Sequence, residues 1–393
     1  MGAIRELAER FWRGEIPPRE LWKPTGQVEE IADGVVFLHA FANVNVLRAG
    51  DGLVLIDTSN YQAREKTFAA VRAIDPARLH IAVYTHGHAD HACGMPPFLA
   101  EAEAKKWARP HIVGHRAVAA RFDRYRATNG YNALINARQF GIAPTWPTEY
   151  DYPDTTYETS HVVKVGDTML VLHHARGGAD DHTWLWHPDS RTLFTGDLFI
   201  WVTPNAGNPA KVQRYAAEWA VALRAMAALD PDVLVPGHGV PIFGADRVRQ
   251  ALVETAEWLE AIVTQTVAAM NAGATLETIV RDVKPPAHLA TRPYLQPVYD
   301  EPDYVVRNLW RLYGGWYDGV PSHLKPAGEA QLGREVAALA GGLIDWAVAV
   351  EPDNRDAHAV RADIYTRRAA GAAALMTRGI FTAAANESKA KSP

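Results

Sequence analysis

One short segment of the sequence gathers side chains that bind metal ions: it reads Thr85-His86-Gly87-His88-Ala89-Asp90-His91. Three of the 16 histidines in the chain fall between His86 and His91, directly after the apolar run 81–84, which is typical of a buried strand. Where a chain turns after a strand, neighbouring side chains can point in different directions. His86 and His88 can then bind one ion while Asp90 and His91 bind a second. Imidazole and carboxylate are ligands of zinc, manganese and iron, so the segment predicts a site for two divalent ions.

The alternative is a surface loop that is rich in histidine by chance. It is disfavoured because imidazoles gathered beside an apolar strand need a ligand that satisfies their polar atoms.

Around this segment, short strand-like runs alternate with helical ones. Strand patterns occur at residues 35–38, 44–47, 53–56, 162–165, 169–173, 183–186, 192–194 and 233–235. Residues 63–74 and 215–228 have the apolar spacing of helices. This order predicts an α/β fold with two sheets packed between helices. The stretch 121–157, rich in Tyr, Asn and Arg, is expected to be a long, partly irregular insertion of the kind that serves binding.

The sequence changes character near Ala245. An apolar stripe on one helix face predicts a long helix that Gly273 ends, and its members are Val248, Leu252, Leu259, Val263, Val267 and Met270. Ala-rich helical runs follow at residues 329–350 and 354–385. We therefore expect an α/β catalytic domain over residues 1–245 and an all-helical domain over residues 246–393.

Composition narrows the class of protein. The chain has 393 residues, of which 48% are hydrophobic and 22% charged, as in a folded protein. The 40 Lys and Arg against 45 Asp and Glu give a net charge of -5, which argues against nucleic-acid binding through a basic surface. No apolar stretch approaches the roughly 18 residues of a membrane span, and the N-terminal residues lack a signal-peptide pattern. Cys93 has no second cysteine to pair with, so we expect a cytoplasmic location.

The segment from His86 to His91 resembles the H-x-H-x-D-H motif of the metallo-β-lactamase superfamily. Asn45 to Asp57 is similar to the opening hairpin of that fold. Thr195-Gly196-Asp197 resembles the segment that supplies a bridging carboxylate, and Pro236-Gly237-His238-Gly239 the segment that supplies the last histidine. The resemblance covers residues 30–245 and implies an αββα sandwich with metals at one edge of its sheets. It also implies that Asp197 and His238 are metal ligands, although either residue taken alone could belong to an ordinary turn.

One further ligand is expected between the first motif and Asp197, where the superfamily usually has a histidine. The segment 173–184 offers His173, His174 and His182. Gly178 occupies the more common ligand position, and in the alkylsulfatase branch a ligand falls four residues later. We therefore expect His182 to be the ligand, with His173 or His174 as the alternatives. Asp180 and Asp181 could orient His182.

The helical part is similar to that same branch. The run Arg311-Leu312-Tyr313-Gly314-Gly315-Trp316-Tyr317-Asp318-Gly319-Val320-Pro321-Ser322 resembles the Gly-Trp-Phe-Asp-Gly-Asn-Pro signature of alkylsulfatases, although it could also be an aromatic core connector. Glu335 to Gly342 resembles their helical dimerisation domain, which implies a homodimer. The chain departs from the best-known alkylsulfatases in its metal ligands, because they have glutamates where His182 and Asp197 stand.

These features favour a dinuclear metal-dependent hydrolase of an alkyl sulfate or similar small-molecule ester, acting through a hydroxide that bridges the two ions. Zinc is the expected metal, with manganese and iron as alternatives, and Asp90 is the candidate catalytic residue. An anionic substrate head needs positive charge, for which Arg176 and Lys211 are candidates. Further candidates for substrate contact lie in the insertion: Tyr131, Asn132, Asn136 and Arg138.

Three other functions stay open. A lactone or thioester hydrolase would use the same metals to attack a carbonyl group. An iron-dependent oxidoreductase of the superfamily is a second possibility, although His88 stands where flavodiiron proteins have a glutamate. The third is a non-catalytic helical dimer that keeps an inert metal site.

Overall fold

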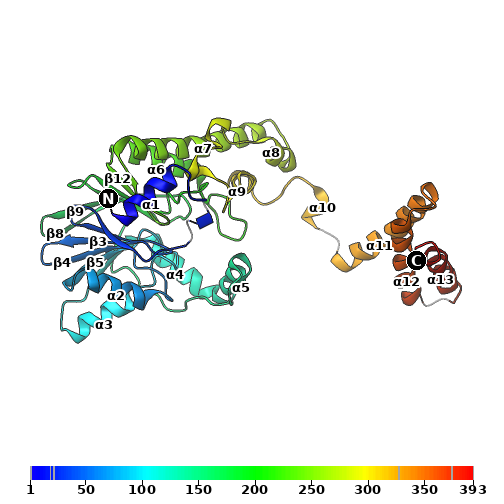
Figure 1. Ribbon diagram of the computed structural model, residues 1–393, viewed down its shortest axis with the longest axis horizontal. Helices are drawn as coiled ribbons and strands as arrows, with labels where there is room; N and C mark the ends of the chain where they lie inside the picture. Colours follow the sequence, from blue (N-terminus) through cyan, green and yellow to red (C-terminus); the bar gives the residue numbers. More distant parts are fainter. Residues whose placement is uncertain (1, 18, 21–22, 326–327, 373–374, 393) are drawn as a thin grey trace. The chain divides into compact units, whose positions relative to one another are not determined.

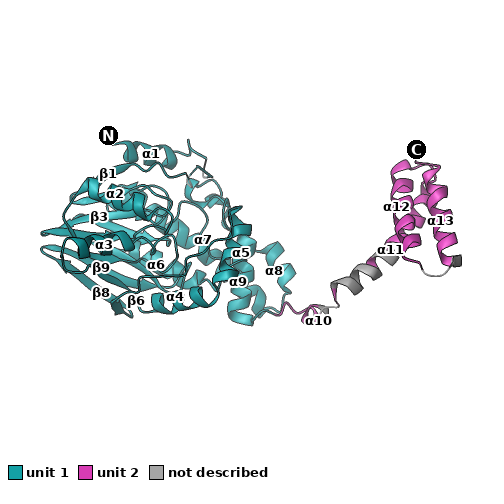
Figure 2. Ribbon diagram, turned by 90° about the horizontal axis from the view of Figure 1, so that it is seen from below, with its two compact units in different colours: residues 1–316 teal, residues 317–393 magenta. Residues whose placement is uncertain are grey.

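The structure is a computed structural model that describes residues 2–17, 19–20, 23–325, 328–372 and 375–392. The chain divides into two compact units, residues 1–316 and 317–393 (Figure 2). The expected domain boundary at residue 245 coincides with the start of α7 (Ala245–Asn271), inside the first unit. A functional division at that point stays a prediction.

Two sheets form the centre of the first unit. The first sheet follows the sequence order β1 (Val28–Ala32), β2 (Val35–Leu38), β3 (Val44–Ala49), β4 (Gly52–Ile56), β5 (Arg78–Val83), β6 (His111–His115) and β7 (Thr155–Tyr157). The second has the spatial order β13 (Ile242–Phe243), β12 (Val233–Pro236), β11 (Thr192–Gly196), β10 (His182–His187), β9 (Thr168–Ala175) and β8 (Ser160–Val165).

Alternate residues of the strands face two different cores. In β4, Val54 and Ile56 lie in the core that the two sheets share, whereas Leu53 and Leu55 face the helices outside the first sheet. Those helices are α2 (Arg64–Ile74), α3 (Pro96–Ala104) and α4 (Ala117–Ala127). On the other side, α6 (Ala216–Ala227) packs on β9 and α7 packs on β12 (Figure 1). This layering confirms the predicted αββα sandwich.

The predicted insertion is more regular than we expected. It is helical through α4 and α5 (Asn129–Phe140), and only residues 141–154 lack regular structure. Asn132 and Asn136 fit inside α5 because their side-chain amides donate to the main-chain carbonyls of Thr128 and Asn132, four residues earlier.

The remaining elements are helical. The first unit begins with α1 (Ala3–Trp12) and ends with α8 (Leu276–Asp282), the short helices η2 (Ala287–Leu289) and η3 (Pro293–Leu295), and α9 (Pro302–Gly314). The second unit contains α10 (Pro321–Leu324), α11 (Glu329–Val350), α12 (Arg355–Gly371) and α13 (Leu375–Lys389), so the predicted run 354–385 divides into two helices. Among the described residues, no helix combines the length and the apolar character that crossing a membrane requires. The side chains of Ser322, Glu335, Ala337 and Ala338, which belong to the runs compared with alkylsulfatases, lie outside the description.

Candidate metal centre

The topology brings the predicted ligands to one edge of the two sheets. β4 and β5 are parallel neighbours, so the residues after them, Asp57 and the segment 85–91, emerge at the same edge. β11 and β12 are also parallel, which places Asp197 and His238 together. β10 runs antiparallel to β11 and therefore begins at that edge, with His182 as its first residue.

His86, His88 and Asp197 form a first group of potential ligands. His86 Nε2 lies 2.7 Å from His88 Nδ1 and 3.5 Å from Asp197 Oδ2, and His88 Nδ1 lies 4.0 Å from the same oxygen. Burial, assisted by the neighbouring His86, lowers the pKa of His88 well below its ordinary value. The His88 ring is thus neutral at physiological pH, as a metal ligand must be.

Asp90, His91 and His238 form a second group. His238 Nε2 is 3.4 Å from both Asp90 Oδ2 and His91 Nε2, and His91 Nε2 is 3.7 Å from Asp90 Oδ2. The second oxygen of Asp197, Oδ1, lies 3.2 Å from His91 Nε2 and 3.4 Å from His238 Nε2. Each oxygen of the Asp197 carboxylate therefore faces a different group, which is the arrangement of a carboxylate that two cations share.

The electrostatic surroundings favour cations at this position. Burial alone would lower the pKa of His91, but the negative charges of Asp197, Asp57 and Asp90 raise it well above the ordinary value for histidine. The buried Asp197 Oδ1 has no hydrogen-bond partner among the described residues. The side chains present thus fit divalent ions, which would satisfy such an atom.

Asp57 fixes the orientation of His91. Its Oδ2 accepts a hydrogen bond from His91 Nδ1 at 2.7 Å, and its Oδ1 accepts one from the Thr85 main-chain N–H at 2.8 Å. Because Asp57 holds the Nδ1 side of the ring, Nε2 faces Asp197 and is the nitrogen that a cation would bind after displacing its proton. His238 is held in the same way, because its Nδ1 donates to the main-chain oxygen of Phe41. This role of Asp57 was not predicted; a carboxylate directly after a fully buried, apolar strand is the sequence feature that could have indicated it.

His182 lies beside the first group, whereas His173 and His174 do not. The His182 ring stacks on His86 with 4.1 Å between ring centroids, and its Nε2 accepts a hydrogen bond from the Asp197 main-chain N–H at 3.2 Å. His173 stacks instead on Trp184. His174 stacks on His115, and its Nδ1 lies within hydrogen-bond distance of the His182 main-chain oxygen. Of the three candidates, only the His182 ring reaches the cluster.

Asp180 and Asp181 bind an arginine that the sequence analysis missed. Arg121 on α4 is almost completely buried, and its Nε donates to Asp181 Oδ2 at 2.7 Å while its Nη2 pairs with Asp180. Asp181 Oδ2 also accepts the main-chain N–H of Gly87, at 3.0 Å, between the two histidines of the first group. Asp181, together with Arg121, therefore supports the main chain of the first motif at Gly87. Among the described residues, neither Asp180 nor Asp181 has a hydrogen bond to the His182 ring.

The residues predicted to contact substrate differ in how far they are buried. Lys211 Nζ donates to Asn136 Oδ1 at 2.6 Å, and burial lowers the pKa of Lys211 to about 8. Arg176 and Arg138 are exposed, with Arg176 over the ring of Tyr215. Tyr131 is 63% exposed on α5. Asn132 is buried, and its amide is used inside α5.

Arg214 is a further cation near the metal centre. It is 3% exposed, its Nη1 donates to the main-chain oxygen of Gly178, and its Nε has no hydrogen-bond partner among the described residues. Its charge is one of those that lower the pKa of His88, after burial and His86. No sequence pattern indicated a buried arginine at this position, because arginine is ordinarily a surface residue.

Comparison with known proteins agrees with this architecture. Residues 40–238, about half of the chain, match the family described as Metallo-beta-lactamase superfamily. The chain belongs to this superfamily. Residues 275–345 match the family described as Alkyl sulfatase dimerisation, which covers α8, α9 and much of α11.

Curated relatives extend the similarity beyond the metallo-β-lactamase fold. The chain is 28% identical over 318 residues to a linear primary-alkylsulfatase from Pseudomonas sp., which covers 76% of this chain and 60% of that protein. It is 27% identical over 377 residues to an (R)-specific secondary-alkylsulfatase from Pseudomonas sp., covering 82% of this chain and 56% of that protein. The chain thus spans little more than half the length of these relatives.

A solved structure shows the same fold. The stereoselective inverting sec-alkylsulfatase Pisa1 from Pseudomonas sp. superposes with a TM-score of 0.68 at 22% identity, over 94% of this chain and 66% of that one.

Proposed function

We propose that this chain is a metal-dependent hydrolase that cleaves an alkyl sulfate or a similar ester with two divalent ions. The observation that carries the proposal is the Asp197 carboxylate, whose two oxygens face two different groups of ligands. One ion would be held by His86, His88, His182 and Asp197, and the other by Asp90, His91, His238 and Asp197. Ions held there would lower the pKa of water toward neutrality and polarise the bond to be cleaved.

The chain's own residues prepare this chemistry. Asp57 keeps the proton of His91 on Nδ1, so that Nε2 stays available as a ligand. The Phe41 carbonyl does the same for His238. Asp90 lies next to the Nε2 atoms of both histidines. Its carboxylate would accept a hydrogen bond from the attacking water and so orient the water toward the ester.

An anionic substrate is supported by the cations around the centre and by the names of the curated relatives. We infer that Arg214, which is buried, and Lys211, which is partly buried, bind the sulfate head, because charge-assisted hydrogen bonds to an oxyanion are strong. The match of residues 275–345 supports a homodimer. Zinc is the proposed metal, and the lone cysteine supports a cytoplasmic location.

A carboxylic ester, thioester or lactone is the second candidate substrate class. The observation that favours it is the ligand set itself, since His182 and Asp197 stand where the best-known alkylsulfatases have glutamates. The same groups could then direct water to a carbonyl carbon.

Elemental analysis of the freshly purified protein, followed by a substrate panel on the same sample, tests these proposals. We expect about two ions per chain and release of sulfate from octyl sulfate or a secondary alkyl sulfate. Turnover of an acyl thioester or lactone without sulfate release would replace the first substrate class by the second. Oxygen consumption that depends on substrate would indicate an oxidoreductase, and bound metal without any turnover would indicate an inert site.

A matched pair of variants tests whether His182, rather than His173, is the metal ligand between the first motif and Asp197. His182→Ala should lower both metal content and turnover, because its ring packs on His86. His173→Ala removes a histidine nine residues earlier that packs on Trp184, and should leave both unchanged. The opposite pattern would reassign the ligand.

A further inference from the structure

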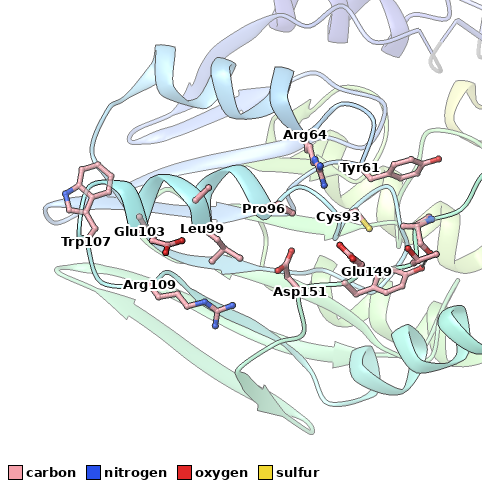
Figure 3. Close-up of a pocket in the computed structure, with 15 residues that line it drawn as sticks. Tyr61, Arg64, Cys93, Pro96, Leu99, Glu103, Trp107, Arg109, Glu149 and Asp151 are labelled. Atoms are coloured by element: carbon pink, nitrogen blue, oxygen red, sulfur yellow. Dashed lines mark hydrogen bonds between the residues drawn. The ribbon is translucent and has the colours of Figure 1, made fainter.

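A cavity with a lining distinct from the metal centre opens beside α3. It has a volume of about 790 Å³ and is formed by the start of α2, the segment from Cys93 through α3, residues 107–109 and the loop 147–151 (Figure 3). None of the seven proposed metal ligands lines it. We call it the α3 cavity, and its size lies in the range of small-molecule sites.

The walls of the α3 cavity combine apolar and charged side chains, and they are held in place. Pro96, Leu99, Trp107 and Pro147 supply apolar surface. The loop 147–151 is held against α4, because Tyr150 stacks on Phe122 of that helix with 4.6 Å between ring centroids. The same loop is tied to α5, where the Asn129 side-chain amide donates to the main-chain oxygens of Trp146 and Pro147. A cavity with fixed walls needs little reorganisation to accept a ligand.

Charged groups of both signs face this cavity without neutralising one another. Asp151 lies between Arg64 and Arg109 (Figure 3). In the described part of the chain, no ion pair joins Asp151 to either arginine, and Arg109 has no ion pair at all. Burial raises the pKa of Asp151, while the charges of Arg109 and Arg64 act in the opposite direction. The charges of the two arginines thus act on Asp151 without a direct contact, although Arg64 Nε also lies 3.6 Å from Glu65 Oε1.

The pattern of charge restricts what that ligand can be. Asp151, Glu149 and Glu103 all line the cavity, so they would repel a ligand that carries only negative charge. Arg64 and Arg109 would in the same way repel a ligand that carries only positive charge. A molecule that carries both charges can place each beside its opposite. We propose that the α3 cavity binds a small zwitterion with an apolar body, such as a free amino acid, with its ammonium group at Asp151 and its acid group at Arg64 or Arg109.

A bound zwitterion would contact the segment that follows the metal motif. Cys93 lines the cavity two residues after His91. Its main-chain N–H donates to Ser59 at 3.1 Å, and the next N–H, that of Gly94, donates to Thr58 Oγ1 at 3.1 Å. Occupancy should therefore slow amide hydrogen exchange in residues 91–95 and leave the second unit unaffected.

Calorimetric titration of the full-length protein tests this proposal. The probes are L-tryptophan, L-phenylalanine and L-leucine, each compared with its N-acetyl derivative, which lacks the cation, and its methyl ester, which lacks the anion. At least one free amino acid should bind at least tenfold more tightly than both of its derivatives. This arm uses only the natural chain, so it does not depend on how a variant folds. Absence of binding by all three free amino acids up to about 10 mM, or equal binding of a derivative, would overturn the proposal.

Substitutions locate the binding. Asp151→Asn and Arg109→Gln should each weaken binding at least tenfold. Lys66→Gln removes a charge from an exposed residue of α2 that does not line the cavity, and should have no effect. If the Asp151 and Arg109 variants bound the probe as well as the natural chain does, the ligand would lie elsewhere and the assignment would be wrong.

Discussion

Replacing Arg121 by methionine should destabilise the first unit far more than an ordinary surface substitution. Arg121 is 2% exposed and Asp181 0% exposed, and the two are joined at 2.7 Å. Methionine fills similar space but leaves the Asp181 carboxylate buried without its cation. Breaking a buried pair from one side costs about 3 to 5 kcal/mol of unfolding free energy. Because Asp181 also holds Gly87 between His86 and His88, metal affinity should fall about 10- to 100-fold.

Urea unfolding followed by tryptophan fluorescence measures the first effect. The double variant Arg121→Met/Asp181→Asn should regain more than half of the lost stability, since neither buried charge remains. Arg116→Met is the control, because its ion pair with Glu158 is more than 60% exposed at both ends and should contribute less than about 1 kcal/mol. If Arg121→Met cost no more than the control, the buried pair would not support the site as described.

Three further predictions concern orientation, pH and specificity. Asp57→Asn should weaken the affinity for one metal ion about 10- to 100-fold, measured by competition with a chelator, and unchanged affinity would exclude the role given to Asp57. Burial lowers the pKa of His39 from 6.5 to about 4, so protonation favours the unfolded chain. The contribution of His39 to the unfolding free energy should be fully retained above pH 6.5 and fall by about 3 kcal/mol as the pH drops to 4; in urea unfolding, the loss of stability between these two pH values should therefore be about 3 kcal/mol smaller in His39→Gln than in the natural chain. Arg214→Met should raise KM for an alkyl sulfate at least tenfold while leaving KM for a neutral lactone nearly unchanged, and equal effects on both would argue against a contact with the anionic head.

The residues of the candidate centre could be picked out from the sequence where they are close together or carry a family pattern. His86 to His91 occupy one short segment, which made them recognisable from residue type alone. Asp197 and His238 depended on the resemblance, because either could have ended an ordinary turn. Their convergence follows from parallel strands, whose ends meet at one edge of a sheet.

The supporting residues could not be predicted, for a physical reason. Arg121 and Asp181 are 60 positions apart, and an arginine on a helix has no pattern that separates a buried side chain from an exposed one. The helix α5 was also missed as a regular element, because asparagine is a poor helix former unless its amide bonds to the helix itself, as Asn132 and Asn136 do. The α3 cavity joins segments of the chain that share no motif.

Anomalous scattering from crystals of the metal-loaded protein would examine the proposed centre directly. Two peaks should flank the Asp197 carboxylate, one beside His86 and His88 and the other beside His91 and His238. A single peak, or a pair of peaks that do not share Asp197, would contradict the two-ion arrangement.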